Sequence, residues 1–100
     1  MTDKVRLGII GIGNQGSTYL RRIVQDNWCP ELEITAVADR NPARLAWAKE
    51  SVSRDIAYFE DAMAMLDSGL IDACIVSTPH YAHPPLAMEC MKRSIHVMVE

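Results

Sequence analysis

A short apolar run that ends in a glycine-rich turn sets the strongest constraint on this chain. The run Leu7–Ile10 is followed at once by Gly11, Gly13 and Gly16 in the sequence LGIIGIGNQG. Glycine inside a helix or a strand costs about 0.5–1 kcal/mol relative to alanine, so three glycines at this place need a physical reason. They either form a tight turn and nothing more, or they let the backbone approach a ligand closely.

Apolar segments alternate with amphipathic ones along the whole chain. The periodicity predicts strands at residues 4–10, 32–39, 57–59, 71–77 and 95–100, and helices at 14–26, 42–52, 62–68 and 84–94. Strands joined by helical crossovers form parallel sheets that are covered on both faces. We therefore expect an α/β, Rossmann-type doubly wound parallel sheet, truncated after about the fifth strand, as one incomplete domain over residues 1–100.

Composition narrows the class of protein further. Of the 100 residues, 49% are hydrophobic, so a packed core can form, and the net charge of −3 gives no footprint for nucleic acid or for an anionic membrane surface. Cys29, Cys74 and Cys90 form no C-x-x-C pair, which favours a reducing, cytoplasmic compartment. His80 and His83 lack a third ligand at a convincing spacing, so we assign no metal site.

The glycines fit the pattern G-x-G-x-x-G, between a predicted strand and a predicted helix. In that context Gly11 permits the tight turn, Gly13 leaves room for a pyrophosphate, and Gly16 lets the helix pack close to the sheet. The N–H groups around Asn14 and Gln15 would then point at the anion from the first helical turn. The pattern predicts a dinucleotide site.

An acidic residue at the end of the next strand supports that interpretation. Asp39 lies at this strand end, where a carboxylate would accept hydrogen bonds from the adenosine ribose and favour NAD over NADP. Arg40 would stack on the adenine, would pair with a 2′-phosphate if Asp39 turned away, or is a solvated turn residue. Asp39 is equally compatible with a turn before Asn41 and Pro42, which are typical of a helix N-cap and its first residue.

The segments LGIIGIGNQG, AVADRNPAR and STPHYAHPPLAMECMKRSIHVMVE together resemble the N-terminal domain of the Gfo/Idh/MocA family, the glucose–fructose oxidoreductase and inositol dehydrogenase group. The resemblance covers essentially the whole chain. Its most specific residues are Thr78-Pro79, His83 and the segment 94–97 that leads to Glu100. Ser94 and Ile95 stand where the family usually has Gly-Lys.

The resemblance implies roles for residues that the glycine motif does not explain. Ser77, Thr78 and Pro79 would line the ribose and nicotinamide side of the cofactor, with His83 close to it. Glu100 matches the glutamate of the family's E-K-P motif, whose lysine is central to catalysis and would follow it. No catalytic residue is therefore expected within the chain itself. A C-terminal domain would bind substrate and build a homo-oligomer.

The expected function is that of the nucleotide-binding domain of an NAD(P)-dependent oxidoreductase. The whole protein would transfer a hydride between the nicotinamide and a sugar, inositol or related polyol. Two alternatives stay open. One is an NAD-dependent, redox-assisted glycosidase of the same family. The other is a non-catalytic dinucleotide sensor.

Overall fold

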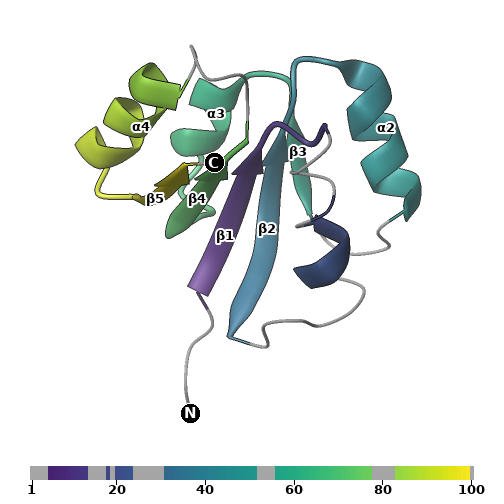
Figure 1. The fold of residues 1–100 in the computed structure, drawn as a ribbon, viewed down its shortest axis with the longest axis horizontal. Helices are drawn as coiled ribbons and strands as arrows, with labels where there is room; N and C mark the ends of the chain where they lie inside the picture. Colours follow the sequence, from purple (N-terminus) through teal and green to yellow (C-terminus); the bar gives the residue numbers. More distant parts are fainter. Residues whose placement is uncertain are drawn as a thin grey trace.

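The computed structural model of the chain describes residues 5–13, 18, 20–23, 31–51, 56–77 and 83–99. Along these residues strands and helices alternate as predicted (Figure 1), and residues 20–23 add a short helical piece. The elements are β1 (Val5–Ile10), β2 (Leu32–Ala38), α2 (Pro42–Ser51), β3 (Ala57–Phe59), α3 (Ala62–Leu66), β4 (Ala73–Val76), α4 (His83–Lys92) and β5 (His96–Val99).

The described strands form one parallel, five-stranded sheet in the order β3-β2-β1-β4-β5. The chain first moves outward from β1 to β3, and then crosses to β4 on the other side of β1. The strand order therefore reverses between β1 and β4, which is the position where open α/β sheets bind their ligands. This topology confirms the predicted doubly wound α/β sheet.

Both faces of the sheet are buried. Successive residues of β1 point to opposite faces, and each face packs against its own cluster of apolar side chains. Leu7 and Ile9 join a cluster with Leu20, Ile23 and the inner face of α2, whereas Ile10 joins a second cluster with residues of α3 and α4. In Figure 1 the helices accordingly lie in two groups, with α2 on one side of the strands and α3 and α4 on the other. The strand pattern in the sequence is explained by this double burial.

Short polar side chains cap the N-termini of α2 and α3, which lie at the carboxyl ends of the strands. The Oδ1 atom of Asn41 accepts a hydrogen bond from the Ala43 N–H at 2.9 Å, and Pro42 is the first residue of α2. Asp61 caps α3 in the same way, accepting from the Met63 N–H at 3.0 Å. These contacts satisfy N–H groups that a helix leaves without an internal partner.

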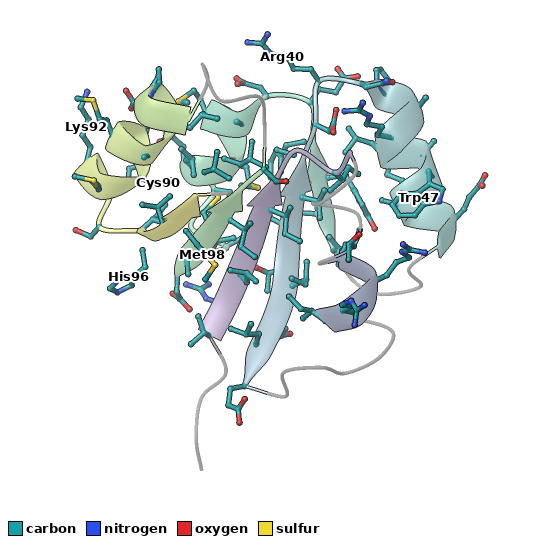
Figure 2. All side chains as sticks on the ribbon, in the orientation of Figure 1. Arg40, Trp47, Cys90, Lys92, His96 and Met98 are labelled. Atoms are coloured by element: carbon teal, nitrogen blue, oxygen red, sulfur yellow. The ribbon has the colours of Figure 1, made fainter. Side chains whose placement is uncertain are left out.

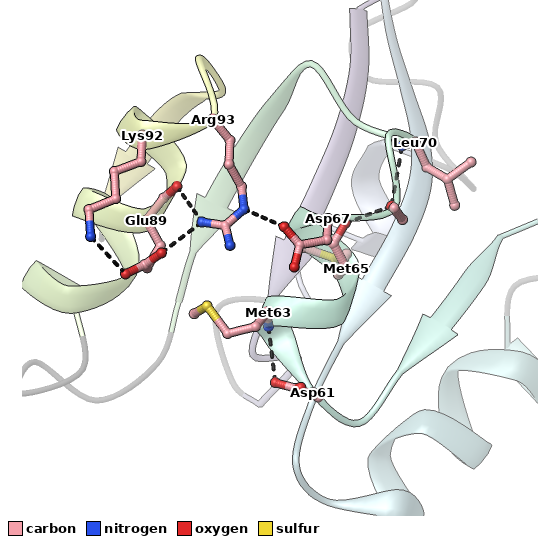
Figure 3. A network of polar contacts seen from close by, with 9 residues as sticks. Asp61, Met63, Met65, Asp67, Leu70, Glu89, Lys92 and Arg93 are labelled. Atoms are coloured by element: carbon pink, nitrogen blue, oxygen red, sulfur yellow. Dashed lines mark hydrogen bonds and ion pairs between the residues drawn. The ribbon is translucent and has the colours of Figure 1, made fainter.

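A network of charged side chains ties α4 to the end of α3 (Figure 3). The Nε of Arg93 lies 2.7 Å from Oδ1 of Asp67, and its Nη1 lies 2.7 Å from Oε1 of Glu89. Lys92 approaches the other oxygen of Glu89 at 3.4 Å. The pKa of the Glu89 carboxyl is lowered by its hydrogen bonds from Arg93 and Lys92.

None of the helices in the described part of the chain is long and apolar enough to cross a bilayer.

Candidate functional site

Hydrogen bonds bring the ends of three strands together at the point where the strand order reverses. The N–H of Gly11 donates to the Ala38 carbonyl at 2.8 Å, which joins the end of β1 to the end of β2. On the other side of β1, the Ser77 N–H donates to the Ile10 carbonyl at 2.9 Å. The glycine turn, Asp39 and Ser77 therefore share one edge of the sheet, as the sequence predicted.

The two described glycines of the turn have different physical roles. Gly11 has a φ of 88°, a left-handed conformation that side chains rarely adopt, so a tight turn there requires glycine. Gly13 matters for the space around it. A Cβ at that position would lie 3.3 Å from Nη1 of Arg44, and its three nearest atoms would all belong to that guanidinium.

Asp39 is a buried carboxylate that faces the glycine turn. The residue is 8% exposed. Its Oδ2 accepts a hydrogen bond from the Ile12 N–H at 2.9 Å, and its Oδ1 accepts one from the Asn41 N–H at 2.8 Å. A carboxylate has about four acceptor positions, so each oxygen retains capacity for another donor. Asp39 thus fixes the turn after β1 to the start of α2.

Two arginines stand near this edge and differ in direction. Arg40 is exposed and its side chain points away from the ribbon in Figure 2. Arg44, in the first turn of α2, points back toward the turn, with its Nη1 3.6 Å from Oδ2 of Asp39. The carboxylate does not turn away, so the condition under which Arg40 would pair with a 2′-phosphate is not met in this structure.

Sequence reasoning did not single out Arg44. The available signal was its position two residues after Pro42, in the first turn of a helix that begins at the ligand-binding edge. A long side chain there can reach back over the strand ends. The reach itself depends on the side-chain conformation, which a sequence pattern does not specify.

The remaining predicted site residues divide into two groups. Ser77 is half-buried at the end of β4, and His83 is the first residue of α4. The others lie outside the described residues: Asn14, Gln15, Gly16, Thr78, Pro79 and Glu100.

Neither a metal nor a reactive thiol marks the described part of the site. Among the described residues no group of three or more His, Cys, Asp or Glu side chains could hold a metal ion. Cys74 is buried in β4, and a thiol hydrogen bond with Cys90 together with burial raises its pKa well above its ordinary value. It is therefore a protonated core residue rather than a nucleophile.

The surroundings of Gly13 match what the pyrophosphate of a dinucleotide requires. A pyrophosphate needs backbone without a Cβ and a favourable charge. Gly13 has no Cβ, and the space that a Cβ would take is bordered by the Arg44 guanidinium, whose side chain is 52% exposed. The residues present therefore fit this group. A doubly wound sheet with a glycine turn at its switch point and a carboxylate after the second strand defines the class of dinucleotide-binding proteins.

Comparison with known families gives the same result. Residues 5–100 match the model of the GFO_IDH_MocA family, described as an oxidoreductase family with an NAD-binding Rossmann fold. The chain belongs to this family. The resemblance stated from the sequence is confirmed, and with it NAD as the family's cofactor.

Two curated proteins with similar sequences differ in the activity that their names give. The inositol 2-dehydrogenase of Arthrobacter sp. (strain FB24) is 28% identical over 100 residues, which are 100% of this chain and 29% of that protein. A glycosyl hydrolase family 109 protein of Shewanella woodyi is 31% identical, over 96% of this chain and 22% of that protein. The chain thus spans less than a third of the length of these relatives.

A solved structure supports the fold and the cofactor class. The WlbA dehydrogenase from Bordetella pertussis, crystallised with NADH and UDP-GlcNAcA, superposes with a TM-score of 0.83 at 28% identity. The match covers 96% of this chain and 28% of that one.

Proposed function

We propose that residues 1–100 form the dinucleotide-binding domain of an NAD(P)-dependent oxidoreductase. The whole protein would transfer a hydride between the nicotinamide and a hydroxyl-bearing carbon of a sugar, inositol or related polyol. The observation that carries this proposal is the bond from the Ile12 N–H to the buried Asp39 carboxylate. It fixes a glycine turn beside an acidic group at the switch point of the sheet.

The proposal gives each predicted residue a task. Gly11, Gly13, Asn14, Gln15 and Gly16 would cradle the pyrophosphate, while Asp39 and Arg40 would lie at the adenosine end. Ser77, Thr78, Pro79, His83 and Glu100 would line the ribose and nicotinamide side. The bound nicotinamide supplies the hydride chemistry. The catalytic lysine expected after Glu100 is part of this proposal, as are a substrate-binding C-terminal domain, a homo-oligomer and a cytoplasmic location.

Calorimetric titration of the purified protein with NAD⁺ and NADH tests the binding step. We expect heat of binding with both nucleotides. A folded sample that gives no heat with either one would overturn the proposal.

A substitution at the glycine turn sharpens the same test. Gly13→Val should abolish nucleotide binding, because the new side chain fills the space that a pyrophosphate requires. Ala46→Val is the matched control, since Ala46 is exposed on α2 and its change should leave binding intact. Equal affinity of the Gly13→Val variant and the wild type would remove the glycine assignment.

One relative favours a second function. The Shewanella woodyi protein is described as a glycosyl hydrolase, and it is 31% identical to this chain. A redox-assisted glycosidase would use the same nucleotide site and release sugar without net formation of NADH. A dehydrogenase would form NADH in proportion to the substrate consumed. Following absorbance at the NADH band together with sugar release separates the two, and binding without either activity favours a sensor.

A further inference from the structure

Two buried thiols meet in the core between β4 and α4. Cys74 lies in β4 and Cys90 near the end of α4, and they are 1% and 0% exposed. Both belong to the apolar cluster on the sheet face that α3 and α4 cover, and α4 packs on β4 and β5 (Figure 1). The two cysteines are free, and a hydrogen bond joins their sulfur atoms. The fold therefore brings one thiol from the sheet into contact with one thiol from a helix.

The two thiols differ in how readily they lose a proton. The hydrogen bond from the Cys74 thiol lowers the pKa of Cys90, against the effect of burial, and the positive charge of Arg93 lowers it further. The same hydrogen bond, together with burial, raises the pKa of Cys74. Because the thiolate is the reactive form of cysteine, Cys90 is the member of the pair that reacts first. Cys74 keeps its proton until a second step.

We propose that Cys74 and Cys90 form a reversible disulfide that ties α4 to β4 when the protein meets a small hydroperoxide. With hydrogen peroxide, the Cys90 thiolate attacks one peroxide oxygen, so that an S–O bond forms and the O–O bond breaks. The hydroxide that leaves takes up the proton lost by Cys90 and becomes water. The S–S bond to Cys74 then forms as the S–O bond breaks, and the Cys74 proton leaves with the hydroxyl as a second water. Two thiols are oxidised and one peroxide is reduced.

The disulfide would add a covalent link where the reduced protein has only weaker contacts. In the described residues, α4 is held by apolar packing and by the contacts of Arg93 with Asp67 of the α3 C-cap. Both thiols are buried, so a small oxidant reaches them when α4 opens locally. A cross-link restricts the unfolded chain, so the oxidised protein should unfold at a higher temperature than the reduced one. The inference is independent of nucleotide binding.

Peptide mapping of the peroxide-treated protein tests the assignment. The chain is treated under native conditions, its free thiols are alkylated, and it is digested without reduction. No lysine or arginine lies between the two cysteines, so trypsin leaves them in one peptide, whereas chymotrypsin can separate them by cutting after Tyr81. We expect a Cys74–Cys90-linked pair of peptides that dithiothreitol separates. Thiols that stay free, a bond to Cys29, or a bond between two molecules would overturn the proposal.

Thermal unfolding of variants tests the consequence for stability. Peroxide should raise the unfolding midpoint of the wild type by about 5 °C or more, and dithiothreitol should reverse the rise. Cys29→Ser is the matched control, because it keeps both members of the pair and should show the same rise. Cys74→Ala and Cys90→Ala each lack one partner and should show none. A wild type without a rise, or an equal rise in Cys90→Ala, would overturn the proposal. If an alanine variant does not fold, the wild-type peptide map still decides the assignment.

Discussion

Two arginine–aspartate pairs link neighbouring elements at opposite ends of the sheet, and they are built differently. At the start of β1, Arg6 binds Asp72 through Nη2 at 2.9 Å and Nε at 3.2 Å, and both side chains are about half exposed. At the far end, Asp39 is buried and held by backbone N–H groups, with Arg44 at 3.6 Å. The first pair is complete in itself, whereas the second leaves a cation with donors to offer.

Charged pairs in such a sheet therefore differ in whether they can take a ligand. A pair whose N–H donors are hydrogen-bonded within the fold joins neighbouring strands. Arg6 also donates from Nη1 to the Gly69 carbonyl at 3.0 Å, so its fork is occupied within the fold. A buried carboxylate beside an unsatisfied, exposed guanidinium has a geometry that a ligand can complete.

The largest effect is expected from removing the buried carboxylate. Asp39→Ala takes the acceptor away from a buried Ile12 N–H and from the Asn41 N–H, which should lower the free energy of unfolding by about 3 kcal/mol. Denaturant unfolding measures this value. Asp72→Ala is the matched control, and its loss should be clearly smaller because that pair is exposed. Equal losses would erase the distinction between the two pairs.

The next largest effect is the loss of stability on replacing Arg6, compared with replacing Arg44. Arg6→Ala removes contacts to Asp72 and to the Gly69 carbonyl, so it should lower the denaturation midpoint. Arg44→Ala should change the free energy of unfolding by no more than about 0.5 kcal/mol, since its long contact leaves the bonds to Asp39 in place. The two melting curves, taken side by side, check this order. A greater loss with Arg44→Ala would make Arg44 a structural residue.

A pH dependence is expected from the complete pair. Hydrogen bonds from the Arg6 side chain and backbone lower the pKa of the Asp72 carboxyl below its ordinary value. Because the folded-state pKa is the lower one, the stabilisation is fully present above the ordinary value and is lost as the pH falls through the lowered one. We therefore measure the free energy of unfolding of the wild type and of Arg6→Gln from neutral to acidic pH. Below the ordinary pKa of an aspartate, this free energy should fall less steeply with decreasing pH in Arg6→Gln than in the wild type. An unchanged acid slope would contradict this origin of the shift.

The smallest expected effect is that of ionic strength on the stability differences between the wild type and the variants. Raising the ionic strength from about 0.1 M to 1 M shortens the screening length from roughly 10 Å to 3 Å. The stability difference between the wild type and Arg6→Ala should shrink, while that between the wild type and Asp39→Ala should persist, because backbone bonds to a buried oxygen are screened little. Thermal unfolding at the two salt concentrations measures both differences.

The order of the elements was predictable from the sequence because the signals are local. Alternation of apolar runs with amphipathic segments gave the five strands, and Asn41 with Pro42 gave the start of α2. The end of α3 was predicted too late. A helix at 62–68 would place Gly69 just after its end, where glycine is common. The C-cap is instead Asp67, and the Ser68 hydroxyl donates to the Met65 carbonyl at 2.6 Å. The Met65 carbonyl, which the helix leaves without an internal partner, is thus satisfied by a side chain before Gly69 is reached.

The position of the site was predictable from the sequence, but its hydrogen bonds and ion pair were not. The glycine motif and Asp39 place it at the carboxyl ends of the strands, and the structure brings those described residues to one edge. Which N–H groups Asp39 accepts, and how far Arg44 reaches, depend on side-chain conformations and on tertiary packing. Exposure is also hard to predict from apolar spacing: Met88 and Met91 of α4 are 57% and 66% exposed.

The central position of β1 has a consequence for how the chain is made. β1 precedes the other described strands in the chain, yet one of its two neighbours is β4, and the contacting residues Arg6 and Asp72 are 66 positions apart. At about 5–20 residues per second, roughly 3–13 s of synthesis separate the two strands. During that interval β1 and β2 can pair while the opposite edge of β1 stays open. The side of β1 that pairs with β4 is therefore completed after the side that pairs with β2.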